Sequence, residues 1–448
     1  MLSLDCENPP PGTAFDPHRR TLTGRINHAG RRPVTFRAEN PAGHAAATVE
    51  LLVGEKIQLT PPMGWNSWYC FSEGVSDARI REVAAALVER GLAAHGWNSV
   101  NIDDCWQGPR GGKYGALQGN ERFPDLKALA DYIHGLGLRF GIYSTPWIST
   151  YAGFRGGSTD NGGEENFFLP VQERFQHNQV FGRYPALHNQ KMDRVGARWH
   201  FGDDVRQWAE WGVDFVKVDW FPNDPMTTRR IAEELRNCGR DIALSLSNNA
   251  PMEAATELLD LAQLCRITGD IRDEWESVSR IGFDHPARWH RELGPGRYPD
   301  PDMLQIGAIG IPNRPNPAYT PTRLTLDEQR LQFSLWSLLS APLLLSCDIA
   351  GMDEATHQLL TNDAVIAVNQ DPLVAPPRIE TRDDGTVIYR KALADGTEAL
   401  GLFNRSDEPR RCRLELRCRG RELWTGATGE LCGEFTIAPH AVRLYRTL

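Results

Sequence analysis

The stretch DDVRQWAEWGVDFVKVDW, residues 203–220, decides the fold class of this 448-residue chain. Its first ten residues place apolar side chains at helical spacing and end in a glycine, and the run DFVKV begins two residues after that glycine. A helix that leads into a short buried strand with polar residues at its end is one unit of a parallel sheet. The stretch therefore predicts an α/β fold.

Units of the same kind recur from Met63 onward. The further strand candidates are the run around Trp65, SVNI, RFGIYS, IALSLS, CRITGD, the segment DMLQIGAIG and APLLLSCDI. The helices expected between them include Ser76 to about Ala94, one that opens with the capping box Thr325 to Glu328, and one that starts near Asp353. About eight strands favour closure into a (β/α)₈ barrel over an open doubly wound sheet.

The segments on either side of the barrel have a different pattern. Residues 1–58 contain the β-rich runs PVTFRAEN and AAATVELLVG and no helical period, which predicts a small sandwich-like β module. The barrel is expected over 59–371, with a long Gly-rich insertion at about 148–202 on the catalytic face. Residues 372–448 alternate as strands and predict a C-terminal antiparallel β-sandwich.

The composition limits the classes of molecule that the protein is expected to bind. A net charge of −9 without clusters of Lys and Arg disfavours nucleic acid and anionic membranes. No run of about 18 apolar residues predicts a membrane span. The 13 Trp, 17 Phe and 10 Tyr suit a neutral sugar, whose C–H face packs on aromatic rings. No cofactor is expected, and a homo-oligomer is compatible with the sequence.

Nine cysteines are scattered along the chain without the close paired spacing of a zinc site. They are Cys6, Cys70, Cys105, Cys238, Cys265, Cys347, Cys412, Cys418 and Cys432. An odd number cannot pair completely within one chain, so we expect neither a structural metal nor a dense disulfide framework.

Barrel enzymes carry their catalytic groups at the carboxyl ends of strands. The strand-end candidates are Trp65, Asp103, Asp104, Tyr143, Lys217, Asp219, Ser247, Asn248, Arg266 and Asp270. Two carboxylates with a Lys and an Arg at one rim fit glycoside cleavage, in which one acid attacks the anomeric carbon and another protonates the leaving oxygen. Lys217 and Asp219 are two residues apart on a strand and point the same way, so the Lys favours ionised Asp219.

Each of these assignments has an alternative. The alternative for Asp219 is a cap of the following helix, so its assignment depends on its combination with the other motifs. Asp273 competes with Asp270 for the acid/base role. The pair Asp103 and Asp104 can accept sugar hydroxyls, yet carboxylates also bind Mg²⁺ or Ca²⁺. Asp300 and Asp302 are expected to tie down a turn between prolines.

From about residue 61 to the C-terminus the sequence resembles glycoside hydrolase family 27, the alpha-galactosidase and alpha-N-acetylgalactosaminidase family. The motifs that carry the resemblance, in the family's order, are PPMGWNSW at 61–68, NIDDCW at 101–106, WAEWGVDFVKVDW at 208–220, RITGDIRDEW at 266–275, DPDML at 300–304 and LLSAPLLLSCDI at 338–349. The N-terminal module is similar to the Ig-like domain of some bacterial members.

The resemblance implies a retaining exo-glycosidase with Asp219 as nucleophile and Asp270 as acid/base. It also implies that Trp65 packs on the galactose ring and that Asp103 and Asp104 bind its 4- and 6-hydroxyls. Further sugar contacts are implied for Tyr143, Lys217, Ser247 and Arg266.

The chain departs from the family pattern at three places. The usual Cys after the nucleophile is Trp220, and the insertion replaces its disulfide partner, so that bridge does not carry over. A bridge between Cys70 and Cys105 stays open, although Cys70 is displaced. Ser247 is smaller than the residue that galactose-selective members often place near the sugar's 2-position.

The leading hypothesis is therefore an alpha-galactosidase, and the Asp103–Asp104 pair argues against an arabinopyranosidase. The small Ser247 makes alpha-N-acetylgalactosaminidase the runner-up, and an inactive sugar-binding protein is the alternative from another class. The N-terminus MLSLDCENPPPG lacks the basic and apolar regions of a signal peptide. We still expect a secreted or periplasmic origin, because such glycosidases usually meet their substrate outside the cytoplasm; the cytoplasm stays open.

Overall fold

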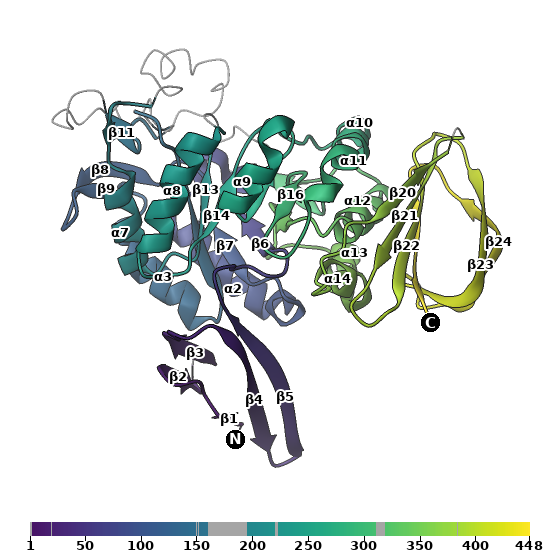
Figure 1. Cartoon of the computed structure of the whole chain (residues 1–448), viewed down its shortest axis with the longest axis horizontal. Helices are drawn as coiled ribbons and strands as arrows, with labels where there is room; N and C mark the ends of the chain where they lie inside the picture. The colour runs from purple at the N-terminus through teal and green to yellow at the C-terminus, as the bar shows by residue number, and fades with distance from the viewer. Residues whose placement is uncertain are drawn as a thin grey trace.

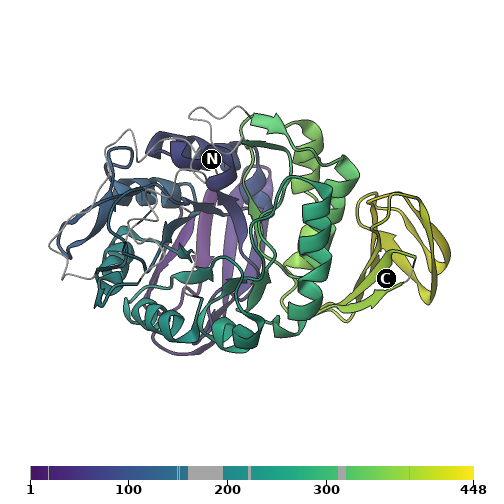
Figure 2. The ribbon, with the colours of Figure 1, turned by 90° about the horizontal axis from the view of Figure 1, so that it is seen from above.

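The computed structural model describes residues 2–18, 20–148, 150, 152–159, 195–219, 223–310, 319–382 and 384–448. Along the chain a small β module comes first, a barrel second and a β domain last (Figure 1). The β module and the β domain lie at separate sides of the barrel (Figures 1 and 2). Most of the predicted insertion lies outside the described residues. Its described ends pair antiparallel as β11 (Ser158–Thr159) and β12 (Arg198–Trp199).

Eight short parallel strands form the centre of the molecule. They are β6 (Met63–Asn66), β7 (Ser99–Asn101), β10 (Arg139–Ser144), β13 (Phe215–Val218), β14 (Ala243–Leu246), β15 (Leu264–Arg266), β16 (Tyr298–Asp300) and β19 (Leu343–Leu345). They pair in this order, and β19 returns to pair with β6. A parallel bridge between Leu304, just after β16, and Leu345 joins the two ends of the sheet. The predicted (β/α)₈ barrel is confirmed.

The seventh strand differs from the sequence expectation. It is β16, which lies immediately before the segment DMLQIGAIG. Asp302 adopts a left-handed backbone with φ 80°, so the extended chain breaks there and the segment contributes only the Leu304 bridge to the barrel. Further on, β17 (Ala308–Gly310) pairs antiparallel with β18 (Tyr319–Pro321) outside the barrel sheet.

Helices cover the outside of the barrel (Figure 2). They are α2 (Asp77–Glu89), α3 (Leu126–Gly135), α7 (Phe201–Trp211), α8 (Pro225–Asn237), α9 (Ala255–Leu261), α10 (Trp275–Ser279), α11 (Pro286–Trp289), α12 (Leu326–Leu338), α13 (Glu354–Leu360) and α14 (Asp363–Asn369), with the single turn α1 (Trp68–Phe71) after β6. No helix in the described ranges is both long and apolar enough to cross a membrane.

Local signals in the sequence set several helix ends. The capping box of α12 is confirmed, since Glu328 N donates to Thr325 Oγ1 (3.2 Å) and Thr325 N donates to the Glu328 carboxylate (2.7 Å). Asp353 caps α13 as expected. The helix α2 is shorter than predicted and ends at Glu89, because Gly91 takes a left-handed conformation (φ 80°) that stops it.

The N-terminal module contains two small antiparallel sheets. One is β1 (Ser3–Glu7), β4 (Gly30–Asn40) and β5 (Gly43–Val53), and the other is the hairpin of β2 (Thr13–Asp16) and β3 (Thr21–Gly24). Among its described residues only Cys6, Pro10 and Val34 are buried, so its own core is small. Arg25 ties it to the barrel by donating to the Gly239 carbonyl at 2.8 Å.

The C-terminal domain is one antiparallel sheet that curls on itself. Its strands are β20 (Arg378–Thr381), β21 (Thr386–Ala392), β22 (Glu398–Asn404), β23 (Arg410–Glu422), β24 (Thr428–Ile437) and β25 (Val442–Thr447). The long β23 pairs with β24 over most of its length and with β25 at its end. Ile388 and Leu402 from one layer pack with Leu414 and Leu431 from the other, which gives the predicted sandwich its core.

Candidate active site

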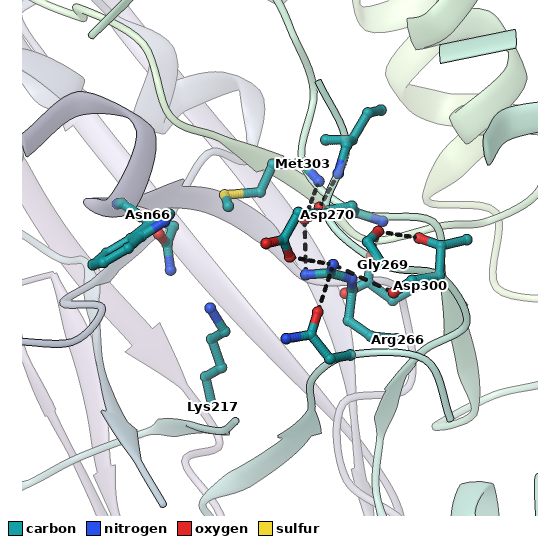
Figure 3. A network of polar contacts seen from close by, with 12 residues as sticks. Asn66, Lys217, Arg266, Gly269, Asp270, Asp300 and Met303 are labelled. Atoms are coloured by element: carbon teal, nitrogen blue, oxygen red, sulfur yellow. Dashed lines mark hydrogen bonds and ion pairs between the residues drawn. The ribbon is translucent and has the colours of Figure 1, made fainter. Parts of the chain in front are cut away.

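A pocket opens at the carboxyl ends of the barrel strands. The residues that line it are Trp68, Tyr69, Asp103, Asp104, Lys217, Asp219, Asn248, Arg266, Asp270 and Met303. Six of the nine residues proposed as site residues from the sequence therefore meet at one place. In Figure 3 Arg266 and Asp270 lie on one side of the view, with Lys217 and Asn66 facing them from the other.

Lys217 links two carboxylates on the floor of the pocket. Its Nζ lies 2.8 Å from Asp103 Oδ2 and 4.0 Å from Asp219 Oδ2. Burial lowers the pKa of Lys217, but the Asp103 and Asp219 carboxylates outweigh burial and raise the pKa above its usual range. Lys217 therefore stays protonated, and its charge is available to the anion on either side.

Asp219 stands directly after β13 and is 7% exposed. Burial raises the pKa of its carboxyl, while Lys217 and the Ser247 hydroxyl act to lower that pKa. Its Oδ1 is buried and makes no hydrogen bond to any described residue. A buried carboxylate oxygen without a donor is uncommon in a folded protein and is typical of a group kept for a reaction.

Arg266 holds the second acid from the opposite side of the pocket (Figure 3). Its guanidinium is 3.0 Å from Asp270 Oδ1 and 3.0 Å from Asp302 Oδ1, and it donates to Asn248 Oδ1 at 3.3 Å. Burial lowers the pKa of Arg266, but Asp302, Asp270 and Asp300 together raise that pKa. The Asp270 side chain is 52% exposed, so it meets the pocket opening while its buried partner fixes one oxygen.

The pair Asp103 and Asp104 has almost all of its oxygens engaged by donors. Asp103 Oδ2 accepts from Asn66 Nδ2 and Lys217 Nζ, both at 2.8 Å, and Asp103 Oδ1 accepts from Asp104 N. Asp104 Oδ1 accepts from Cys105 N at 2.6 Å, which leaves only the buried Asp104 Oδ2 without a donor among the described residues. Burial and the neighbouring Asp103 raise the pKa of Asp104.

One free carboxylate oxygen does not suit a divalent cation, which takes six or more ligands. Within the described ranges no group of three or more His, Cys, Asp and Glu is arranged to hold a metal ion. The donor set around Asp103 and Asp104 instead suits a hydroxyl group, which can donate to Asp104 Oδ2.

The other three candidates, Trp65, Tyr143 and Ser247, do not line the pocket. Trp65 is fully buried and its indole N–H donates to the Cys347 carbonyl at 2.9 Å, so in this conformation it offers no ring face to a sugar. Tyr143 is buried beside Lys217, whose Nζ is 5.5 Å from the centre of its ring. Ser247 is buried against Asp219.

The pocket wall includes three residues that the sequence analysis did not select and one, Asn248, that it named only as a strand-end candidate. Trp68 and Tyr69 begin the short helix α1 after β6, and Met303 follows Asp302. Asn248 lines the pocket where Ser247 was expected. The backbone of Asn248 is left-handed (φ 62°), which breaks the alternation of the strand and turns the Asn248 side chain into the pocket. The aromatic pair directly after the first strand is a signal that could have identified Trp68 and Tyr69.

The contacts of Asp273 and Asp302 bear on the alternatives that the sequence left open. Asp273 accepts from Thr322 Oγ1 and from Arg323 N (3.0 and 3.1 Å), so it serves the loop structure and does not line the pocket. Asp302 accepts from Ile271 N and from Met303 N, both at 2.8 Å. Asp302 N in turn donates to Asp300, in line with the expected turn.

The cysteines are all free thiols. The bridge between Cys70 and Cys105 that the sequence left open is absent from the structure, and both thiols are buried. Burial raises the pKa of both groups well above the usual value, which keeps them protonated and unreactive. Trp220, at the other departure from the family pattern, lies outside the described residues.

Comparison with known proteins places this pocket in a family. The chain matches the sequence profile of the melibiase family described as alpha galactosidase A, over residues 60–166 and 188–371. Alpha-galactosidase 2 of Arabidopsis thaliana is 31% identical over 413 residues, which cover 88% of this chain and 91% of the plant protein. The chain belongs to the alpha-galactosidase family. Every residue that lines the pocket lies inside the two matched segments.

Solved structures agree with this membership. A Bacteroides fragilis protein provisionally named an alpha-galactosidase/melibiase superposes with a TM-score of 0.81 at 27% identity, covering all of this chain and 92% of that one. A β-L-arabinopyranosidase of glycoside hydrolase family 27 from Geobacillus stearothermophilus has a TM-score of 0.71 at 27% identity, covering 87% of this chain and 96% of that one. The resemblance to family 27 is confirmed.

Proposed function

We propose that this alpha-galactosidase family member hydrolyses terminal, non-reducing α-D-galactosyl residues with retention of configuration. The main support is that Asp219 and Asp270 meet in one pocket, where Lys217 lies beside Asp219 and Arg266 beside Asp270. One buried acid and one acid at the opening match the two tasks of a retaining glycosidase, attack on the ring and protonation of the leaving group.

In the first step the Asp219 carboxylate attacks the anomeric carbon. The bond from that carbon to the leaving oxygen breaks, and Asp270 gives its proton to the oxygen, so the alcohol leaves neutral. In the second step Asp270 takes a proton from water, and the oxygen of that water displaces Asp219 from the anomeric carbon. Two inversions give net retention. Lys217 stabilises Asp219 whenever it is an anion, both before attack and after release.

The remaining wall residues bind and orient the sugar. Asp104 Oδ2, buried and without a donor among the described residues, accepts a sugar hydroxyl, and Asp103 is held in place beside it. Trp68 and Tyr69 offer aromatic surface for the C–H face of the ring. Tyr143 and Ser247 support residues of the pocket, since Tyr143 packs on Lys217 and Ser247 on Asp219.

Turnover of an aryl α-galactoside tests the proposal. The wild-type chain should release the phenol, and proton NMR should detect the α-anomer of galactose first. Asp219→Ala should abolish release, whereas Asp131→Ala, which changes an exposed acid of α3 that does not line the pocket, should retain it. A wild-type chain inactive on both α-galactosides and α-N-acetylgalactosaminides would refute the proposal and favour a sugar-binding protein.

The runner-up activity is that of an alpha-N-acetylgalactosaminidase. Its supporting observation is the small Ser247 at the end of β14, next to the Asn248 amide in the pocket wall. An amide N–H₂ can donate to an acetamido carbonyl as well as to a hydroxyl. The ratio of kcat/KM for the two aryl glycosides decides between the activities. An aryl β-L-arabinopyranoside belongs in the same comparison, because it lacks the sugar's 6-hydroxyl.

We also propose the three-domain division at 1–58, 59–371 and 372–448, together with an export route for the natural protein. The fewest buried side chains lie in the N-terminal module, so limited proteolysis should release fragments ending near residue 58 before the barrel is cut. Cell fractionation of the source organism tests export. Activity confined to the cytosolic fraction would contradict it.

A further inference from the structure

We propose that His440, in the C-terminal domain, is a positioning residue for the loop 267–274, which carries the acid/base Asp270. The inference rests on the proposed function for the role of Asp270, but its structural part does not. His440 lies between β24 and β25, far along the chain from this barrel loop, and it contacts residues that flank or hold the loop. Its contacts reach that loop by two separate routes.

The direct route is an aromatic stack. The His440 ring lies on the indole of Trp275, with ring centroids 4.1 Å apart and an angle of 20° between the planes. Trp275 is the first residue of α10 and follows the loop directly. Within the loop, Arg272 N donates to Ser277 Oγ at 2.9 Å, so the loop and the first turn of α10 are joined by a bond. Moving Trp275 therefore moves the end of the loop.

The second route passes through the start of α12. His440 Nδ1 is 2.9 Å from Glu328 Oε1, and the other oxygen of Glu328 closes the capping box with Thr325. Thr322 and Arg323, just before that cap, hold the Asp273 carboxylate of the loop. The C-terminal domain thus fixes both the residue after the loop and the residues that hold its Asp273.

The loop needs this support because of where Asp270 stands. On the near side the loop is fixed by Asp302, which accepts from Ile271 N, and by Tyr69, whose hydroxyl donates to the Ile271 carbonyl at 2.9 Å. The Asp270 side chain itself is half exposed and is held by Arg266 alone among the charged residues described. Its direction toward a leaving oxygen therefore depends on the backbone at both ends of the loop.

The backbone of His440 is a second, independent sign of a fixed role. Its φ of 48° is left-handed, a conformation that a non-glycine residue keeps only when its surroundings impose it. Both ring nitrogens contact carboxylates, Nδ1 that of Glu328 and Nε2 that of Asp407 at 2.9 Å. The two carboxylates thus hold the imidazole from both ring nitrogens while its face lies on Trp275.

The test exploits the chemistry of the leaving group. An alkoxide needs a proton in order to leave, whereas a nitrophenolate leaves without one, so a misplaced general acid harms alkyl α-galactosides selectively. His440→Asn removes the ring but keeps a residue that tolerates left-handed φ. We expect kcat/KM to fall on the order of tenfold for an alkyl α-galactoside and less than about threefold for a nitrophenyl α-galactoside.

Trp424→Phe is the matched control. Trp424 also joins the C-terminal domain to α12, through a 2.9 Å bond from Nε1 to Ser334 Oγ, but it contacts no part of the loop 267–274 in any bond or ring contact described. It should leave the ratio of the two rates unchanged. Trp275→Leu, which removes the stack from the barrel side, should change the ratio in the same direction as His440→Asn.

Hydrogen exchange supplies a readout without catalysis. In His440→Asn the amides of Ile271 and Arg272 should exchange faster than in the wild type, and in Trp424→Phe they should not. Equal losses on both substrates, or unchanged exchange in the loop, would overturn the positioning role. A wild-type chain inactive on every glycoside would instead refute the proposed function, while the exchange comparison would still decide the structural part.

Discussion

Two buried lysines, Lys217 in the pocket and Lys391 in the C-terminal domain, have pKa values that are shifted in opposite directions. Lys217 lies between the carboxylates of Asp103 and Asp219. Burial lowers its pKa, but the two anions more than compensate and hold the pKa above the usual range. The ammonium is thus a permanent charge in the pocket.

Lys391, in β21, has only neutral acceptors. Its Nζ donates to the Ser337 carbonyl at 3.2 Å, to Ser340 Oγ and to the Val368 carbonyl, and its side chain is fully buried. Ser337 and Val368 lie in the last turns of α12 and α14, where the helix dipoles are negative. Burial nevertheless lowers the pKa of Lys391 to about 7. Both lysines are buried, so the difference between their pKa values comes from the full negative charges beside Lys217 and not from burial.

The largest effect is expected where the charge is used in chemistry. Asp219→Asn removes the proposed nucleophile and one of the two anions beside Lys217, so kcat on an aryl α-galactoside should fall at least about 10³-fold. Circular dichroism should detect a folded chain. Retention of more than a tenth of the activity would exclude Asp219 as the nucleophile.

Lys217→Met tests what the cation does for stability. It leaves Asp103 buried without a cation, so the free energy of unfolding should drop by about 3–5 kcal/mol in urea titrations. Adding Asp103→Asn to Lys217→Met should recover part of the loss, because the unpaired charge is then removed. Additive losses in the double variant would contradict the pairing.

Lys391→Met should reveal the lowered pKa of Lys391 through the pH dependence of the stability. Between about pH 7 and 10 the unfolded chain keeps the Lys391 proton and the folded chain does not. Relative to the Met variant, the stability of the wild type should therefore rise with pH, by up to about 1.4 kcal/mol per pH unit. The same comparison with Lys217→Met should give no such slope, because Lys217 is protonated in both states. Equal slopes would remove the distinction between the two lysines.

The smallest effect is expected at one acceptor of Lys391. Ser340→Ala deletes a single hydrogen bond and should cost about 1 kcal/mol at pH 6. At pH 9 the cost should be smaller, since the neutral amine has fewer protons to donate. Thermal unfolding at the two pH values measures it, and a cost that grows with pH would argue against the lowered pKa.

The contrast between the lysines was only half visible in the sequence. Lys217 stands two residues before an acid at the end of a barrel strand, so its partner could be named. Lys391 lies in TVIYRKAL, a strand of ordinary alternating pattern, and its three acceptors come from segments far away along the chain. No local sequence pattern indicates that a lysine in a strand will bond to the backbone carbonyls of distant helices.

The sequence selected strand ends that meet at the pocket, but not always the residue of each strand end that lines it. Alternation along a strand fails where the backbone becomes left-handed, which is why Asn248 and not Ser247 lines the wall. The turn after β6 likewise brings Trp68 to the wall and leaves Trp65 buried. For the loop acids, only the contacts of Asp273 separated it from Asp270.

The sequence by itself determined the barrel, the strand-end acids and the family, because these depend on periodicity, short spacing and motifs in order. The tertiary structure decided which side chains reach the pocket, that Cys70 and Cys105 stay apart, and that His440 of the C-terminal domain packs on Trp275, next to the Asp270 loop. These features arise from contacts between residues distant along the chain, and the distances between such residues are set only when the whole chain packs.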